Sequence, residues 1–168
     1  MNAPVVDVPR DRAKAPVLVL GLGNDILTDD AVGLRVVESL HATLAGEGAI
    51  ELRTTTEMGL ALLDEVAGRE NLVLVDAVQT GRVPAGSILE LDAADLGGPL
   101  ATGPHFLGVG ETLALGELLG LEMPRRVGIV AVEVADPYTL GTDLTPAVQA
   151  ALGPAAERVA AIATGWAR

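Results

Sequence analysis

The sequence predicts a single α/β domain with an open, mostly parallel five-stranded sheet and helices on both faces. Three observations support this fold. Short apolar runs alternate with segments of helical periodicity, the apolar runs lack the polar alternation of a half-exposed strand, and 168 residues suffice for one domain. We expect residues 1–16 to form a disordered tail and residues 17–168 to form the domain.

The first half of the chain predicts a β-α-β-α-β series. In its first helix, Val32, Val36, Val37 and Leu40 recur at the spacing of one helical face. The expected elements are, in order, strand 17–22, helix 30–44, strand 49–53, helix 57–67 and strand 72–75.

The second half adds two strands and two helices. The first of these strands follows a turn that is too short for a crossover helix, so we expect it to run antiparallel. Thr145 is the expected N-cap of the last helix, with Pro146 at its first position and an interruption near Gly153-Pro154. The expected elements are, in order, strand 87–91, helix 105–119, strand 126–132 and helix 145–164.

Composition excludes several classes of protein. The chain has no Cys, which rules out disulfides, thiolate-bound metals and a cysteine nucleophile. The net charge of −12 disfavours nucleic-acid partners. No apolar run approaches the length of a membrane span, and the charged, proline-containing N-terminus is unlike a signal peptide. We therefore expect a monomer in the cytoplasm that binds neither nucleic acid nor membrane.

Candidate site residues gather in the loops that follow the parallel strands, where ligands of open α/β sheets bind. Asp29 and Asp30 introduce the first helix; one carboxylate suffices to cap it, and the other is then available as a ligand or an acid/base group. Asp76 ends the buried run 72–75, and His105 begins a helix. Two carboxylates and an imidazole suit a divalent transition metal such as nickel or zinc.

Other polar residues of this region are candidates for contacting a substrate. His41 is not among them, because it lies late in the first helix on a face we expect to be solvated. The candidates are Asn24, Asp29, Glu57 and Glu133.

The run VLGLGNDILTDDAVGLRVVE, residues 19–38, closely resembles the N-terminal signature of the [NiFe]-hydrogenase maturation endopeptidases. The resemblance continues in LVDA at residues 74–77, in Pro104-His105, in VGI at residues 127–129 and in LTPAV at residues 144–148. It therefore covers most of the chain.

This resemblance implies an aspartic-type endopeptidase that removes a C-terminal extension from the hydrogenase large-subunit precursor once nickel has been inserted. The family's three nickel-binding positions correspond to Asp30, Asp76 and His105. The precursor is then the partner and carries the metal, and no tightly bound cofactor of the protease is expected. With no covalent nucleophile assigned, these three residues are expected to be catalytic through metal-assisted hydrolysis.

One segment departs from the family pattern. Where many members have an Asp-Gly-Gly-Thr loop, this chain has RTTTE at residues 53–57, which bears on substrate choice. Two alternative functions are a peptidyl-tRNA hydrolase, which shares a Gly-Leu-Gly-Asn strand exit, and a non-enzymatic nucleotide-binding regulator. The net charge opposes a tRNA substrate, and the acid pair at the helix entrance opposes a bound phosphate.

Overall fold

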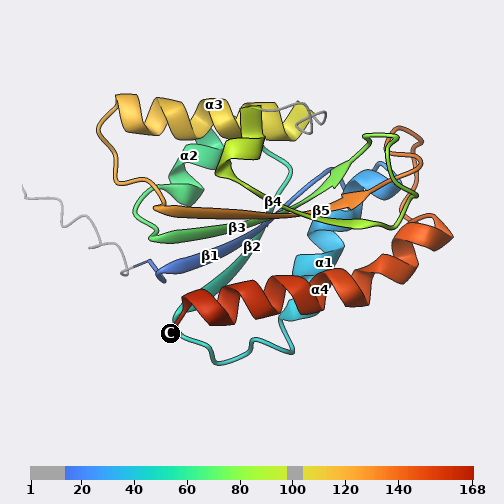
Figure 1. The fold of residues 1–168 in the computed structure, drawn as a ribbon, viewed down its shortest axis with the longest axis horizontal. Coiled ribbons are helices and arrows are strands. Elements are labelled where there is room, and N and C mark those ends of the chain that lie inside the picture. Colours follow the sequence, from blue (N-terminus) through green and yellow to red (C-terminus); the bar gives the residue numbers. More distant parts are fainter. Residues whose placement is uncertain (1–13, 98–103) are drawn as a thin grey trace, which may run out of the picture.

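A computed structural model describes residues 14–97 and 104–168, without the side chains of residues 104–107. It contains the five expected strands and four α-helices, with two short 3-10 helices (Figure 1). The strands are β1 (Val17–Leu22), β2 (Ile50–Thr55), β3 (Asn71–Val78), β4 (Ile88–Asp92) and β5 (Arg126–Glu133). The helices are η1 (Asp29–Ala31), α1 (Val32–Leu40), α2 (Leu60–Val66), η2 (Ala93–Gly97), α3 (Pro104–Leu118) and α4 (Pro146–Trp166).

The five strands form one sheet in the order β2-β1-β3-β5-β4. The pairs among β2, β1, β3 and β5 are parallel, and β4 runs antiparallel to β5. This confirms the predicted fold class. The carboxyl ends of four strands therefore lie at one end of the sheet, which we call the carboxyl end, and the opposite end is the amino end.

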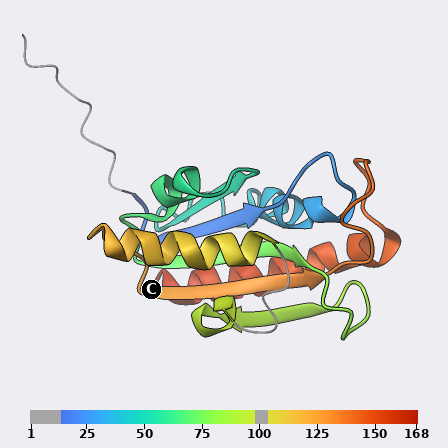
Figure 2. The same ribbon diagram turned by 90° about the horizontal axis from the view of Figure 1, so that it is seen from above.

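Alternating side chains of the central strands build two separate cores. Val17 and Val19 of β1 pack with α1 and α4 on one face, whereas Leu18 and Leu20 pack with α2 and α3 on the other. Figures 1 and 2 show the sheet between these two helical layers. The apolar runs lack alternation because both of their faces are buried.

Several boundaries and one interruption differ from the sequence-based expectation. The first helix is shorter than residues 30–44, because η1 precedes it and α1 ends at Leu40. Strand β3 continues past residue 75 to Val78. The expected interruption of the last helix is wrong: α4 runs through Pro154. Pro154 is exposed, as is Ala150, so water can bind the carbonyl that the proline leaves without an amide partner.

The chain is attached to the domain from Lys14 onward. Lys14 Nζ donates to the carbonyl oxygens of Asp64 and Ala67 at 2.7 and 2.9 Å, which satisfies acceptors near the C-terminus of α2. The carbonyl of Pro16 accepts the amide of Asn71. Residues 14–16 of the expected tail are therefore ordered, and residues 1–13 lie outside the described part of the chain.

Helix lengths bear on the expected absence of a membrane span. Among the described helices, none combines the length and the apolarity that crossing a bilayer requires.

Candidate active site at the carboxyl end of the sheet

Asp76 lies inside β3 and not, as predicted, in the loop that follows it. In the sheet it is paired with Ala131 of β5, and its side chain is fully buried. One carboxylate oxygen, Oδ1, accepts the amide of Ala77 at 2.8 Å. Because side chains alternate along a strand, Asp76 shares a face with Leu74 and Val78, which belong to the core beneath α2 and α3. The strand thus presents this carboxylate toward the α2/α3 layer.

Asp30 lies in η1, which close packing holds against the end of the sheet. A side chain at Gly33 would collide with the carbonyl oxygens of Leu22 in β1 and Val75 in β3. Only glycine allows α1 to approach both strand ends this closely. Since η1 directly precedes α1 and contacts β3, Asp30 is placed at the same end of the sheet as Asp76. Asp30 is partly exposed, so solvent and a substrate can reach it.

Asp29 is a structural anchor and not the substrate contact we expected. Its side chain is fully buried. Oδ1 accepts the amide of Thr145 at 2.7 Å, and Oδ2 accepts the Thr145 hydroxyl at 2.9 Å and the amides of Asp136 and Ala135 at 3.0 and 3.3 Å. These bonds join the loop after β1 to the loop after β5 and to the start of α4. Of the acid pair, Asp29 therefore holds the fold, and a chemical role of Asp30 stays a prediction.

Glu133 also acts within the fold. It is the last residue of β5 and only 2 % exposed. Its carboxylate accepts the amide of Gly81 at 2.7 Å and the hydroxyl of Thr80 at 2.8 Å, which shapes the turn after β3. Both oxygens are thus engaged with the turn and are not displayed to a substrate, contrary to expectation.

Asn24 shapes the loop after β1. Its side-chain oxygen accepts the amide of Ile26 at 3.1 Å, which forms a local turn. The residue is partly exposed, so its contact with a substrate stays a prediction.

Glu57 is exposed beside a pocket of about 320 Å³ at the carboxyl end of β2. The pocket lies between the loop after β1 and the loop after β2, so it includes most of the segment that departs from the family pattern. Its lining consists of Asp25, Leu34, Glu38, Thr54, Thr55, Thr56 and Glu57. A role of Glu57 in contacting a substrate stays a prediction.

His105 lies in the first turn of α3, and its side chain is outside the described residues. Helix α3 ends near the start of β5, which lies at the amino end of the sheet. Its first turns therefore lie toward the carboxyl end (Figures 1 and 2). Packing agrees with this placement, because a side chain at Gly108 would meet Met58, which follows β2. The backbone of His105 is therefore at the same end of the sheet as Asp30 and Asp76, over the face on which Asp76 lies.

That Asp30, Asp76 and His105 together bind a metal ion stays a prediction. Among the side chains that the structure describes, no group of three or more His, Asp or Glu residues has the arrangement of a metal site. His105 is not among those side chains. His41, which we expected to be solvated, is exposed.

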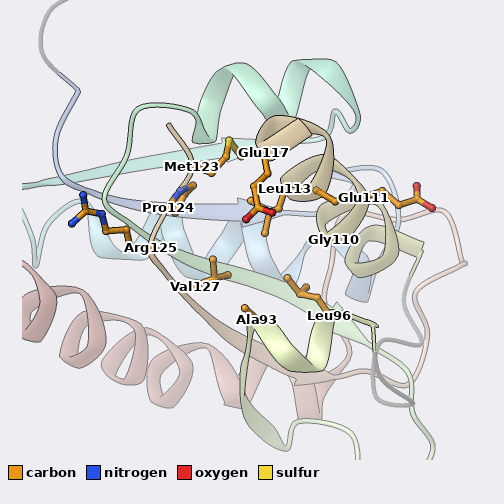
Figure 3. A pocket seen from close by; sticks show the side chains of 11 residues that line it. Ala93, Leu96, Gly110, Glu111, Leu113, Glu117, Met123, Pro124, Arg125 and Val127 are labelled. Carbon is orange, nitrogen blue, oxygen red and sulfur yellow. The ribbon is translucent and has the colours of Figure 1, made fainter. Parts of the chain in front are cut away.

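A larger pocket, of about 630 Å³, lies away from these carboxylates. Figure 3 shows it between α3 and η2, beside the first residues of β5 at the amino end of the sheet. Its lining includes Leu96, Leu113 and Val127, with Glu111 and Glu117 from the helix. Of the predicted site residues whose side chains the structure describes, none lines this pocket, so volume alone does not locate the chemistry.

Sequence reasoning missed the organising role of Asp136, in the loop after β5. Asp136 Oδ1 accepts the amides of Thr139 and Tyr138 at 3.0 and 3.2 Å. Hydrogen bonds from the side chain and amide of Thr139, and then from the amide of Tyr138, lower the pKa of Asp136 below its usual value. Its backbone carbonyl accepts the Thr28 hydroxyl. The available signal was the Asp-Pro pair at residues 136–137, which favours a turn.

Comparison with known proteins identifies the family of this chain. A sequence model described as hydrogenase maturation protease (HycI) matches residues 34–162. The chain belongs to the hydrogenase maturation protease family. It is 32% identical to the hydrogenase 2 maturation protease of Escherichia coli K12 over 86% of this chain and 88% of that protein.

Solved structures of hydrogenase maturation proteases share the fold. The E. coli hydrogenase maturating endopeptidase HybD superposes with a TM-score of 0.72 and 32% identity, covering 87% of this chain and 90% of that one. HybD from Thermococcus kodakarensis has a TM-score of 0.67 at 23% identity, over 88% and 98% of the two chains, and supports the fold alone. The family assignment favours the protease over the two alternative functions, a peptidyl-tRNA hydrolase and a nucleotide-binding regulator.

Proposed function

We propose that this chain is the endopeptidase that removes the C-terminal extension of a nickel-loaded [NiFe]-hydrogenase large-subunit precursor. The observation that carries the proposal is the placement of Asp30 and Asp76 at one end of the sheet of a hydrogenase maturation protease. Asp30 comes from η1 and Asp76 from β3, two segments that contact each other. The backbone of His105 approaches the same end from α3.

Oxygen and nitrogen ligands fit the proposed substrate. Nickel belongs here to the precursor as cargo, and carboxylate and imidazole groups bind it well. Asp30, Asp76 and His105 would complete the coordination of an ion that the precursor already holds. The precursor is then cut only after the metal has been inserted, because an empty precursor lacks the group that these residues recognise.

The proposed reaction is hydrolysis of one peptide bond. Water adds to the scissile carbonyl carbon, the C–N bond breaks, and the water protons end on the leaving amine, so the products are a carboxylate and a free amino group. The chain has no cysteine to act as a nucleophile. A metal can polarise the carbonyl or activate the water, and a carboxylate beside it can accept a proton. Asp30 is the exposed carboxylate of the pair and therefore our choice for this proton transfer.

Several finer properties form part of the same proposal. We expect an aspartic-type endopeptidase that acts as a monomer in the cytoplasm, has no tightly bound cofactor of its own and activates the hydrogenase by processing it. We expect it to bind neither nucleic acid nor membrane, in line with the net charge of −12.

The decisive experiment compares nickel-loaded and nickel-free precursor, with the large subunit weighed by mass spectrometry. Wild type should release the C-terminal fragment from the loaded precursor alone. Asp76→Asn keeps the shape of the buried side chain and should slow release at least about a hundredfold. Asp64→Ala, which removes an exposed carboxylate on α2, is the matched control and should cut normally.

Two outcomes would contradict the proposal. One is equal cleavage of nickel-free precursor by wild type. The other is normal cleavage by Asp76→Asn that has the melting temperature of wild type.

A further inference from the structure

Three large apolar side chains stand in solvent on two neighbouring loops at the carboxyl end of the sheet. Ile26, in the loop after β1, is 58% exposed, and Tyr138 and Leu140, in the loop after β5, are each 75% exposed. We call these three residues the apolar rim. Tyr138 is the only tyrosine in the chain. Exposed apolar groups that gather in one place mark surfaces that bind another molecule.

Main-chain bonds join the two loops of the apolar rim side by side (Figures 1 and 2). Leu27 and Leu140 form an antiparallel bridge. The amide of Gly141 donates to the carbonyl of Ile26 at 3.0 Å, and the amide of Thr28 donates to the carbonyl of Thr139 at 3.0 Å. The two segments that carry the rim thus lie side by side, although they are more than a hundred residues apart in the sequence.

Buried and local carboxylates fix the backbone beneath the rim. Asp29 anchors both loops to the start of α4, and Asp136 holds the amides of Tyr138 and Thr139. With the backbone held in this way, the three side chains are kept in solvent before any partner arrives. A surface organised in advance loses less conformational entropy when it binds.

The charged residues of the two rim loops all have one sign. Residues 23–31 and 134–145, which form the two loops, contain five aspartates and no Lys, Arg or His. A partner segment that brings basic residues beside apolar ones would complement both features.

We infer that the apolar rim is the docking surface for the precursor and receives an apolar segment flanked by basic residues. The inference rests on the proposed function, because it concerns how the same substrate reaches the same site. Ile26 precedes Asp30 by four residues in one loop, so the rim is continuous with the candidate site. A polypeptide whose scissile bond reaches Asp30 therefore passes beside the rim.

A second apolar group provides a matched control. At the C-terminus of α3, Leu118 is 84% exposed and Leu119 is 58% exposed. These leucines lie toward the amino end of the sheet, where the helix connects to β5. They are as apolar and as exposed as Ile26 and Leu140, but they lie at the opposite end of the sheet from Asp30 and Asp76.

The experiment compares Ile26→Ser/Leu140→Ser with Leu118→Ser/Leu119→Ser. Processing of nickel-loaded precursor gives kcat and KM, and calorimetry gives the Kd for nickel-free precursor, which is bound without being cut. The rim double variant should raise both KM and Kd about tenfold and leave kcat unchanged. The α3 double variant should match wild type in all three. For wild type, raising ionic strength from about 0.1 M to about 1 M should weaken binding, because four of the five aspartates, all but Asp29, are at least partly exposed to solvent.

The outcomes separate this inference from the proposed function. If wild type cuts the loaded precursor and the rim variant keeps the KM and Kd of wild type, docking at the rim is excluded and the proposed function stands. Equal effects of the two double variants would likewise exclude a specific rim. If wild type cuts no precursor, the proposed function fails. Should wild type form dimers in sedimentation that the rim variant abolishes, a second copy occupies the rim and the inference is overturned.

Discussion

The two ends of the sheet use their carboxylates in different ways. At the amino end, Glu51 meets guanidinium groups: Arg69 at 2.6 Å and Arg53 at 3.3 Å. The hydrogen bond from Arg69, and then the charges of Arg69 and Arg53, lower the pKa of Glu51 despite its partial burial. At the carboxyl end, Asp29 and Glu133 instead accept bonds from backbone amides and hydroxyl groups.

This difference determines which end of the sheet keeps a net negative charge. A guanidinium offsets the charge of its carboxylate, whereas amide and hydroxyl donors carry no net charge that could offset it. The carboxyl end therefore keeps a negative field while its loops are firmly held. Such a field suits a cation or a basic segment. The ion pairs of Glu51 at the amino end instead stabilise the fold.

The largest effect on this comparison should come from removing the anchor of the carboxyl end. Asp29→Ala leaves the partly buried amides of Thr145 and Asp136 without their acceptor, which should cost about 3 kcal/mol of unfolding free energy. For a chain of this size, that corresponds to a melting temperature lower by roughly 6–12 °C. Asp29→Asn keeps one acceptor oxygen and should lose about half as much. A melting curve of Asp29→Ala within about 2 °C of wild type would refute the anchoring role.

A smaller effect is expected from breaking the amino end. Arg69 is almost fully buried, and besides Glu51 it contacts the carbonyl of Ala15 at 3.1 Å. Arg69→Met should lower the unfolding free energy by only about 1–2 kcal/mol, because Glu51 keeps Arg53 as a partner and can turn to water once Arg69 is gone. Chemical denaturation measures this loss. The kcat for precursor processing should not change, and a lower kcat would show that the two ends are coupled.

The smallest effect concerns acidification of the loop after β5. The pKa of Asp136 is lowered from its ordinary value of 3.8, so the folded loop binds the proton more weakly than the unfolded chain does. The stabilisation from Asp136 is therefore fully present above about pH 4 and is lost as the pH falls through the lower, folded value. In an NMR titration, the amides of Tyr138 and Thr139 should shift with a midpoint below 3.8. Asp136→Asn should abolish this transition, and a midpoint above 3.8 would contradict the assignment.

Most of the fold could be predicted because the information is local. The run VLVLGL predicts β1 with its observed bounds, and a short turn before β4 predicts its antiparallel direction. Errors arose where tertiary packing overrides a local signal. Pro154 does not interrupt α4, because it lies on the exposed side of the helix. The other side, which carries Val148, Ala155 and Val159, is buried in the core and holds the helix in place.

The site was predictable in location but not in the division of roles. That Asp30 and Asp76 lie at one end of the sheet follows from the parallel order of the strands. Which member of the acid pair is buried could not be predicted, because the donors that bind Asp29 come from residues 135–145, more than a hundred positions away. The same holds for Glu133, whose partners Thr80 and Gly81 belong to a distant turn. Hydrogen-bond partners this remote leave no periodic pattern in the sequence.

The close approach at Gly33 restricts how the site can open. Because the helix backbone rests on the carbonyl groups of Leu22 and Val75, no side chain lies between them that could change rotamer and let the helix slide. The start of α1 and the ends of β1 and β3 must then move as a single body. The loops around this body must therefore move when a large substrate enters the site. We expect a hinge in these loops and not at the start of α1.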